Sequence, residues 1–177
     1  TDVTKYRCAD GDAFVQGTLK GALTIAAANN VIVTNDTVYS TSPSPNFDTV
    51  PSTSTDILGL IANNFVETYH PANASGTNLT SQLNDLKVHA AILSVAHSFR
   101  VQKYEVGASL GTLTILGAIA QNYRGIVRRT SGPTGYAKNY IYDTRLKVSS
   151  PPYFLDPVQS AWQINAWAEV KRPNDFT

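Results

Sequence analysis

Three charged residues, Asp36, Glu67 and Arg100, are the candidates for acid–base chemistry in this sequence. Glu67 and Arg100 follow two copies of the same short motif, so a repeating fold would place them together on one outer face with Asp36. Enzymes that cleave polysaccharides use grouped carboxylates, with or without Ca²⁺ and an arginine base. The chain has only three glutamates, however, and a solvated surface ion pair explains the same residues. We therefore expect a weak binding site here and assign no catalytic residue.

Metal chemistry has little support in the sequence. His70, His89 and His97 are the only histidines, and no two of them have the spacing of ligands on a helix. A metal site needs at least three converging ligands. Asp10 and Asp12 flank a glycine and could bind Ca²⁺ through their oxygens, but a simple turn explains them better. No phosphate-binding loop, nucleophile signature or dinucleotide fingerprint is present, and we expect neither a metal nor a cofactor.

A fourfold repeat predicts the elements that would position these residues. Each copy joins an alanine, two polar residues and a large apolar residue, and each follows an apolar run. The copies are Ala28-Asn29-Asn30-Val31, Ala62-Asn63-Asn64-Phe65, Ala96-His97-Ser98-Phe99 and Ala120-Gln121-Asn122-Tyr123, at spacings of 34, 34 and 24 residues. Short β-branched runs with breaks this close together are typical of successive strands in a repeat protein.

The repeat predicts an all-β, right-handed parallel β-helix of about four coils in residues 1–128. Segments 40–55 and 71–85 are rich in polar and turn residues and are expected to be loop insertions. Residues 129–177 do not repeat and are expected to cap the same domain, with a short helix beginning after Asp156. A helix over residues 85–98 is the alternative for one alanine-rich stretch, but the matching stretches contain glycine and β-branched residues that resist helix formation.

Equivalent residues of stacked coils should lie above one another about 4.8 Å apart. The four alanines would then form a buried column, with two polar columns beside it that act as a structural ladder of side-chain hydrogen bonds. The polar columns are Asn29, Asn63, His97 and Gln121, and Asn30, Asn64, Ser98 and Asn122. The residues expected to cover the last coil are Tyr153, Phe154, Leu155 and Trp162.

Composition limits the partners of the protein. Charged residues make up 15% of the chain, against about a quarter in an average globular protein, and the polar surface is rich in Ser, Thr and Asn. This balance suits a secreted or surface-exposed β-protein. A net charge of +1 gives no basis for nucleic-acid binding, and no apolar run is long enough for membrane contact within this segment.

The single cysteine, Cys8, has two interpretations that stay open. It is either a small buried hydrophobic residue or one half of a disulfide whose partner lies upstream. The chain begins at Thr1 and contains no Met, which suggests a processed chain or an excised fragment. Any signal peptide or anchor is expected upstream of Thr1.

Five segments of the chain, residues 17–39, 57–71, 88–99, 111–125 and 142–167, together resemble a family of actinobacterial surface proteins of uncharacterised function. The resemblance implies a pilus-associated or pilin-like protein with a β-helical ectodomain behind a prepilin-like hydrophobic segment. The family offers no catalytic motif. We therefore expect a non-enzymatic cell-surface or pilus-associated structural or adhesion protein that assembles with other surface or pilus subunits. The alternative is a carbohydrate-active enzyme or a glycan-binding module.

Overall fold

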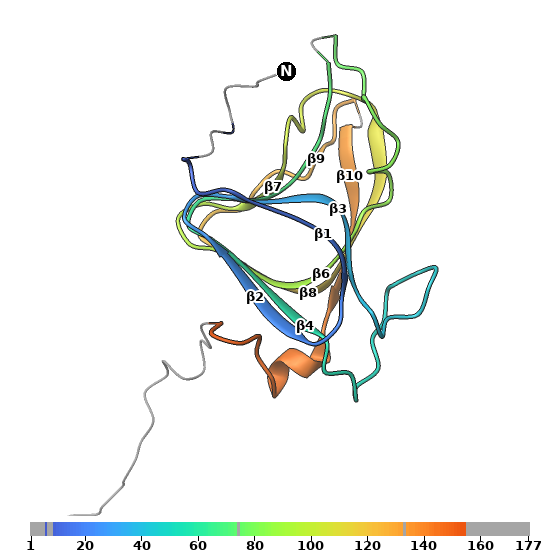
Figure 1. Cartoon of the computed structure of the whole chain (residues 1–177). Coiled ribbons are helices and arrows are strands. Elements are labelled where there is room, and N and C mark those ends of the chain that lie inside the picture. Colours follow the sequence, from blue (N-terminus) through green and yellow to red (C-terminus); the bar gives the residue numbers. More distant parts are fainter. Residues whose placement is uncertain (1–5, 7–8, 74, 133, 155–177) are drawn as a thin grey trace, which may run out of the picture.

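The computed structural model describes residue 6 and residues 9–73, 75–132 and 134–154. These residues form an all-β fold whose strands wind around one apolar core (Figure 1). The strands are β1 (Ala13–Leu19), β2 (Ala22–Ala27), β3 (Val31–Tyr39), β4 (Ile57–Ala62), β5 (Val66–Thr68), β6 (Lys87–Ser94), β7 (Phe99–Val101), β8 (Ser109–Gln121), β9 (Arg128–Arg129) and β10 (Thr134–Tyr142), and a 3₁₀ helix, η1 (Thr144–Lys147), follows. Strand β6 confirms that the alanine-rich stretch is not a helix.

All ten strands belong to one mixed sheet that curls until it is nearly closed (Figure 1). Strands β2, β4, β6 and β8 pair in parallel in that order and form one side, which we call the β2–β8 wall. Strand β3 pairs in parallel with β1, β5 and β6, and β5 pairs with β7. Strand β10 pairs in parallel with β8 and antiparallel with β9.

The predicted regular right-handed parallel β-helix is wrong. In such a fold each turn would add equivalent strands in one register. Here β3 has three partners, the β1–β3 and β10–β8 pairs contain register shifts, and the chain reverses between β9 and β10. The connections differ too much for equal turns, because residues 40–56 separate β3 from β4 whereas only residues 63–65 separate β4 from β5.

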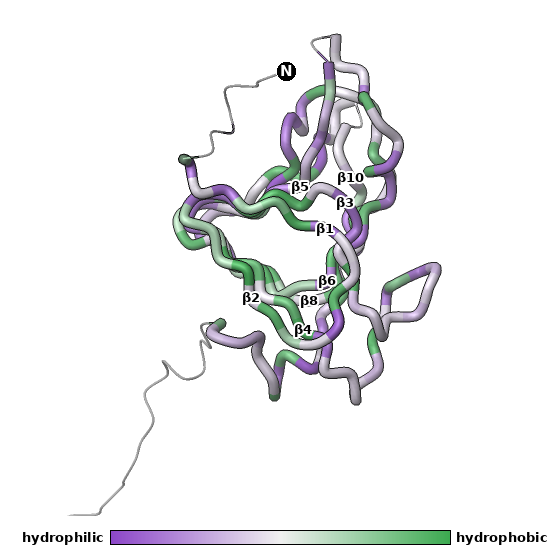
Figure 2. Tube along the Cα trace, in the orientation of Figure 1, coloured by the Kyte–Doolittle hydropathy of each residue, from purple (hydrophilic) through white to green (hydrophobic). Residues whose placement is uncertain are grey.

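The alternation of side chains along the strands explains where the core lies. Most inward residues of β3, β4, β6 and β8 are apolar and buried, and Val31, Leu60 and Ile92 among them are almost completely inaccessible. Hydrophobic stretches follow the walls and hydrophilic stretches gather in the long connections (Figure 2). Each fully buried side chain of this size contributes roughly 1.5–3 kcal/mol through removal from water.

The four alanines of the repeat do not stack as predicted. Ala62 is buried, but Ala28 and Ala120 are exposed. The residues that face one another in the β2–β8 wall are Ala27, Ala62, Ser94 and Gln121. The corners differ in length, with three residues between β4 and β5 and four between β6 and β7, so equivalent motif positions move out of register.

The segment after η1 crosses the outer side of the β2–β8 wall. The Thr24 hydroxyl donates to the Pro152 carbonyl oxygen at 2.5 Å. A Cβ on residue 59 would come within 2.7 Å of Cδ2 of Phe154, so Gly59 lets this ring approach the strand. The C-terminal part of the described chain is therefore held against β2 and β4.

The aromatic cap expected over the last coil is not formed by the described residues. Tyr153 is 100% exposed, and Phe154 contacts the wall near its first strands rather than its last. Leu155, Trp162 and the short helix expected after Asp156 lie outside the described residues.

Buried Arg145 joins η1 to the long connection between β3 and β4. Its Nε and Nη2 donate to Asp143 Oδ1 and Oδ2 at 3.0 and 2.6 Å. Its Nη1 donates to the carbonyl oxygens of Ser54 and Asp56 at 3.0 and 2.8 Å, and its guanidinium lies 5.1 Å from the centroid of the Tyr39 ring. This bidentate pairing replaces the hydration that both charges lose on burial.

His89 in β6 is held as a neutral ring. The Tyr39 amide donates to its Nδ1 at 3.0 Å, so Nε2 carries the proton and donates to the Phe47 carbonyl oxygen at 2.7 Å. A second proton on Nδ1 would face the Tyr39 N–H. Burial lowers the pKa of His89 below its ordinary value of 6.5, which agrees with this geometry.

Stability is expected to fall as the pH drops below about 6.5, because unfolded chains take up a proton at His89 that the folded chain excludes. The pKa of His89 is lower in the folded chain than in the unfolded chain. Its contribution to stability is therefore complete above the unfolded pKa and is lost as the pH falls towards the folded pKa. Urea unfolding between about pH 7.5 and 5 measures this slope. His89→Gln should flatten it, and an equal slope in the unmodified protein and in this variant would contradict the assignment.

Candidate functional site

The β2–β8 wall ends in a strand whose outer edge is partly unpaired. Along one edge, β8 pairs with β6 as far as Gln121. Along the opposite, outer edge, β8 pairs with β10 only as far as Gly117, and no strand of the described chain continues along residues 118–121. We call this outer side of residues 118–121 the β8 edge.

The backbone of the β8 edge presents hydrogen-bonding groups outward. The Asp143 amide donates to the Gly117 carbonyl oxygen at 3.1 Å, which shows that Gly117 faces the side of β10. Because backbone groups alternate along a strand, those of Ile119 and Gln121 face the same side. Beyond Gly117 these groups form a short template for another strand.

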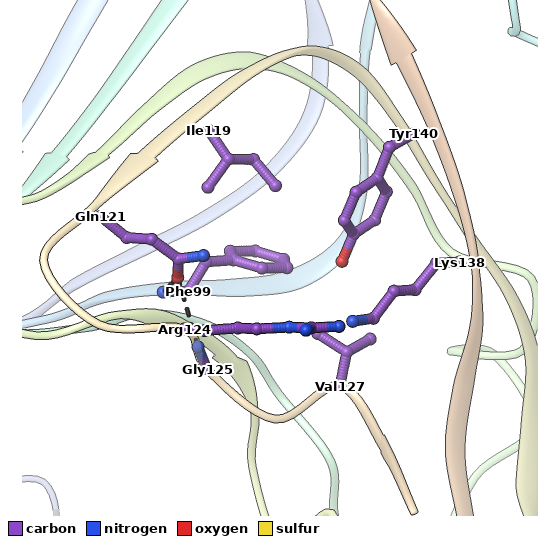
Figure 3. A pocket seen from close by; sticks show the side chains of 8 residues that line it. All are labelled: Phe99, Ile119, Gln121, Arg124, Gly125, Val127, Lys138 and Tyr140. Carbon is purple, nitrogen blue, oxygen red and sulfur yellow. Dashed lines mark hydrogen bonds between the residues drawn. The ribbon is translucent and has the colours of Figure 1, made fainter. Parts of the chain in front are cut away.

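A hollow of about 490 Å³ lies beside the β8 edge (Figure 3). We call it the end hollow. Its lining residues are Phe99, Ile119, Gln121, Arg124, Gly125, Val127, Lys138 and Tyr140. A smaller hollow of about 190 Å³ shares Ile119 and Tyr140 with it and follows β8 back to Ile115. A strand added at the β8 edge would therefore have space in these hollows for the side chains on one of its faces.

The end hollow has an apolar floor and two cations. Phe99, Ile119 and Val127 supply the floor. Arg124 and Lys138 enter from opposite sides and extend towards one another (Figure 3). Burial, and then the positive charge of Arg124, lower the pKa of Lys138. The lining contains no Asp or Glu, so these two charges face each other without a carboxylate between them.

Local hydrogen bonds fix the shape of the end hollow. The side-chain oxygen of Gln121 accepts from the amides of Phe99 and Gly125 at 2.9 and 3.4 Å. This holds the corner that carries Arg124 against the start of β7. Burial raises the pKa of Tyr140 to about 12, so its hydroxyl stays protonated and able to donate into the hollow at neutral pH.

The structure brings Glu67 and Arg100 together, with the Glu67 side chain buried and the Arg100 side chain 31% exposed. They face each other on β5 and β7, and Arg100 Nε donates to Glu67 Oε2 at 2.9 Å. Glu67 is 0% exposed, and Oε1 accepts from Tyr6 at 3.3 Å and Gln102 at 2.5 Å. Asp36 accepts from the amide of residue 87 at 2.8 Å instead of joining this pair.

Side-chain hydrogen bonds join the first members of the expected polar ladder, but not along the expected columns. Asn64 donates to the side-chain oxygen of Asn29 at 2.6 Å, and Asn29 donates to Asp12 at 2.8 Å. Asn30 accepts from the Phe65 amide at 3.1 Å. The first column therefore runs diagonally, from Asn29 to Asn64 rather than to the exposed Asn63.

The later members of the ladder have other partners. The ring of His97 stacks on Phe65 with centroids 4.6 Å apart, and the Arg100 guanidinium carbon lies 3.6 Å from the centroid of the Phe65 ring. Asn122 donates to the carbonyl oxygen of residue 96 at 3.2 Å, and Ser98 is buried beside the corner of the end hollow. Gln121, expected in the ladder, instead fixes that corner.

Sequence reasoning missed Arg124, Lys138 and Tyr140. A signal for the first was present, because Arg124 directly follows the fourth copy of the repeat, at the position that Arg100 occupies after the third copy. Lys138 and Tyr140 belong to a segment without a repeat, and only the pairing of β10 with β8 brings them to the hollow.

Other classes of site find no support within the described residues. No three His, Cys, Asp or Glu side chains gather there in a group that could hold a metal ion. The described part of the chain contains no helix with the length and apolar character of a transmembrane span. Cys8 lies outside it.

Comparisons of the chain with protein-family models, with curated proteins and with solved structures give no match. The site must therefore be interpreted from its own geometry.

Proposed function

We propose that the protein is a non-enzymatic structural or adhesion protein that binds an extended segment of a partner chain at the β8 edge. The resemblance to actinobacterial surface proteins supports a location at the cell surface, with other surface or pilus subunits as partners. Added strands bind through backbone hydrogen bonds, and pockets for alternate side chains give specificity.

The observation that carries this proposal is the unpaired outer side of β8 with a hollow beside it. Proteins usually protect a sheet edge by charge, proline or a covering segment, because an open edge pairs with other chains. Here the exposed side chains on the edge are Ala120 and Gln121, and neither carries a charge that would give such protection. The neighbouring hollows leave room for the side chains of an added strand.

A glycan-binding module is the second candidate, because aromatic rings lie exposed at the same end. Tyr123, Tyr140 and Tyr142 are all large exposed side chains. A glycan array would test this reading, and loss of binding in Tyr140→Ala would support it. Cleavage of a glycan that is abolished by Glu67→Ala would contradict a non-enzymatic role.

The leading proposal is tested by binding of an amidated synthetic peptide in which Thr alternates with Val and no residue is charged. Fluorescence anisotropy of the labelled peptide with the full chain measures its affinity. Ala120→Lys places a charge on the β8 edge and should weaken binding about tenfold, or roughly 1.4 kcal/mol. Ala26→Lys is the matched control, since Ala26 is exposed on β2 at the other end of the same wall. Equal affinity in all three proteins, or a loss only in Ala26→Lys, would contradict the site.

A further inference from the structure

We propose that the partner segment bound at the β8 edge carries a carboxylate near its C-terminal end, and that Arg124 and Lys138 hold this carboxylate between them. This inference rests on the proposed function, because it names the chemistry of the partner that the β8 edge selects.

The direction of the wall places the carboxylate. Every strand of the β2–β8 wall is parallel to its neighbour, so a strand that continues the wall would also run parallel to β8. Its C-terminal end would then lie beside Gln121, where β8 ends. Arg124 follows three residues later, and Lys138 extends from β10 on the opposite side of the end hollow (Figure 3).

The charges of the end hollow favour an anion at this place. Within the described chain, the side chains of Arg124 and Lys138 take part in no hydrogen bond or ion pair, although Lys138 lies 5.9 Å from the centroid of the Tyr140 ring. By contrast, Arg100 forms an ion pair with Glu67, and Arg145 forms one with Asp143. A carboxylate between Arg124 and Lys138 would relieve their repulsion and accept charge-assisted hydrogen bonds.

The floor of the hollow favours a peptide over a small free anion. Phe99, Ile119 and Val127 present apolar surface next to the cations. Acetate or sulfate would leave this surface in contact with water. An extended segment with alternating apolar side chains covers the floor and brings the carboxylate to the two cations at the same time.

The experiment compares three amidated peptides that alternate Thr with Val and end in Gln, Glu or Lys. Affinities are measured by anisotropy with the full chain and with Arg124→Gln, Lys138→Gln and the control Arg128→Gln. Arg128 is exposed on β9 and does not line the hollow. The Glu peptide should bind about tenfold more tightly than the Lys peptide, and each hollow variant should reduce this preference several-fold while the control keeps it. The preference should also decrease with salt.

Each outcome separates this inference from the function on which it rests. If all three peptides bind equally and Ala120→Lys weakens their binding, the proposal of a partner strand at the β8 edge stands and the inferred carboxylate on that strand is wrong. If none binds, both are wrong. If acetate or a heparin fragment binds at Arg124 and Lys138 and the Glu peptide shows no preference, the hollow is a site for a free anion or an acidic glycan, and the inference is overturned.

Discussion

Asp143→Ala is expected to lower the free energy of unfolding by about 3–5 kcal/mol. The substitution leaves the guanidinium of Arg145 buried with two carbonyl oxygens as its remaining partners, from Ser54 and Asp56. It also removes the side chain that accepts from the Arg145 amide at the start of η1. Urea unfolding monitored by circular dichroism measures the change.

A double variant provides the control for Asp143→Ala. Removing both charges with Asp143→Leu and Arg145→Met leaves no unpaired ion, so it should cost less than about 2 kcal/mol. A double variant as unstable as Asp143→Ala would mean that the shape of this contact, rather than its charge pairing, holds η1 to the connection between β3 and β4.

Phe99→Ala is expected to destabilise the protein by about 3–5 kcal/mol, because it removes a large ring from a well-packed core. Phe99 is 2% exposed and pairs in register with Val66 on β5. It also lies under the end hollow, so its loss should weaken binding of the Glu peptide. Thermal unfolding and anisotropy measure these two effects separately.

Tyr123→Ala is the matched control, because the repeat places Tyr123 at the position of Phe99. Tyr123 is 63% exposed, and its replacement should change stability by no more than about 0.5 kcal/mol. Similar losses in both variants would show that Tyr123 packs in the core.

The comparison of Phe99 with Tyr123 shows how far the sequence predicts the fold. Short β-branched runs correctly indicate an all-β chain, and Glu67 and Arg100 do face each other on paired strands. Copies of one motif do not give equal turns, however. Register depends on how many residues each corner uses and on β-bulges, and neither is encoded in the motif itself.

The candidate site was less predictable than the fold. The repeat places Gln121 in a ladder, yet its side-chain oxygen accepts from the amides of Phe99 and Gly125 and fixes the corner of the end hollow. Lys138 and Tyr140 reach the hollow only because β10 adds to β8 and stops opposite Gly117. An absent strand leaves no pattern in the sequence, so the β8 edge could be recognised only from the pairing of its neighbours.

Amide hydrogen exchange of Ile119 and Gln121, with and without the Glu peptide, tests the central claim most directly. Their backbone groups face the β8 edge, so a bound strand should slow their exchange about tenfold when the peptide concentration is about ten times its Kd. Ala118 and Ala120, whose groups face β6, should change much less. Unchanged rates at Ile119 and Gln121 with saturating peptide, or protection on β2 instead, would show that the partner does not bind at this edge.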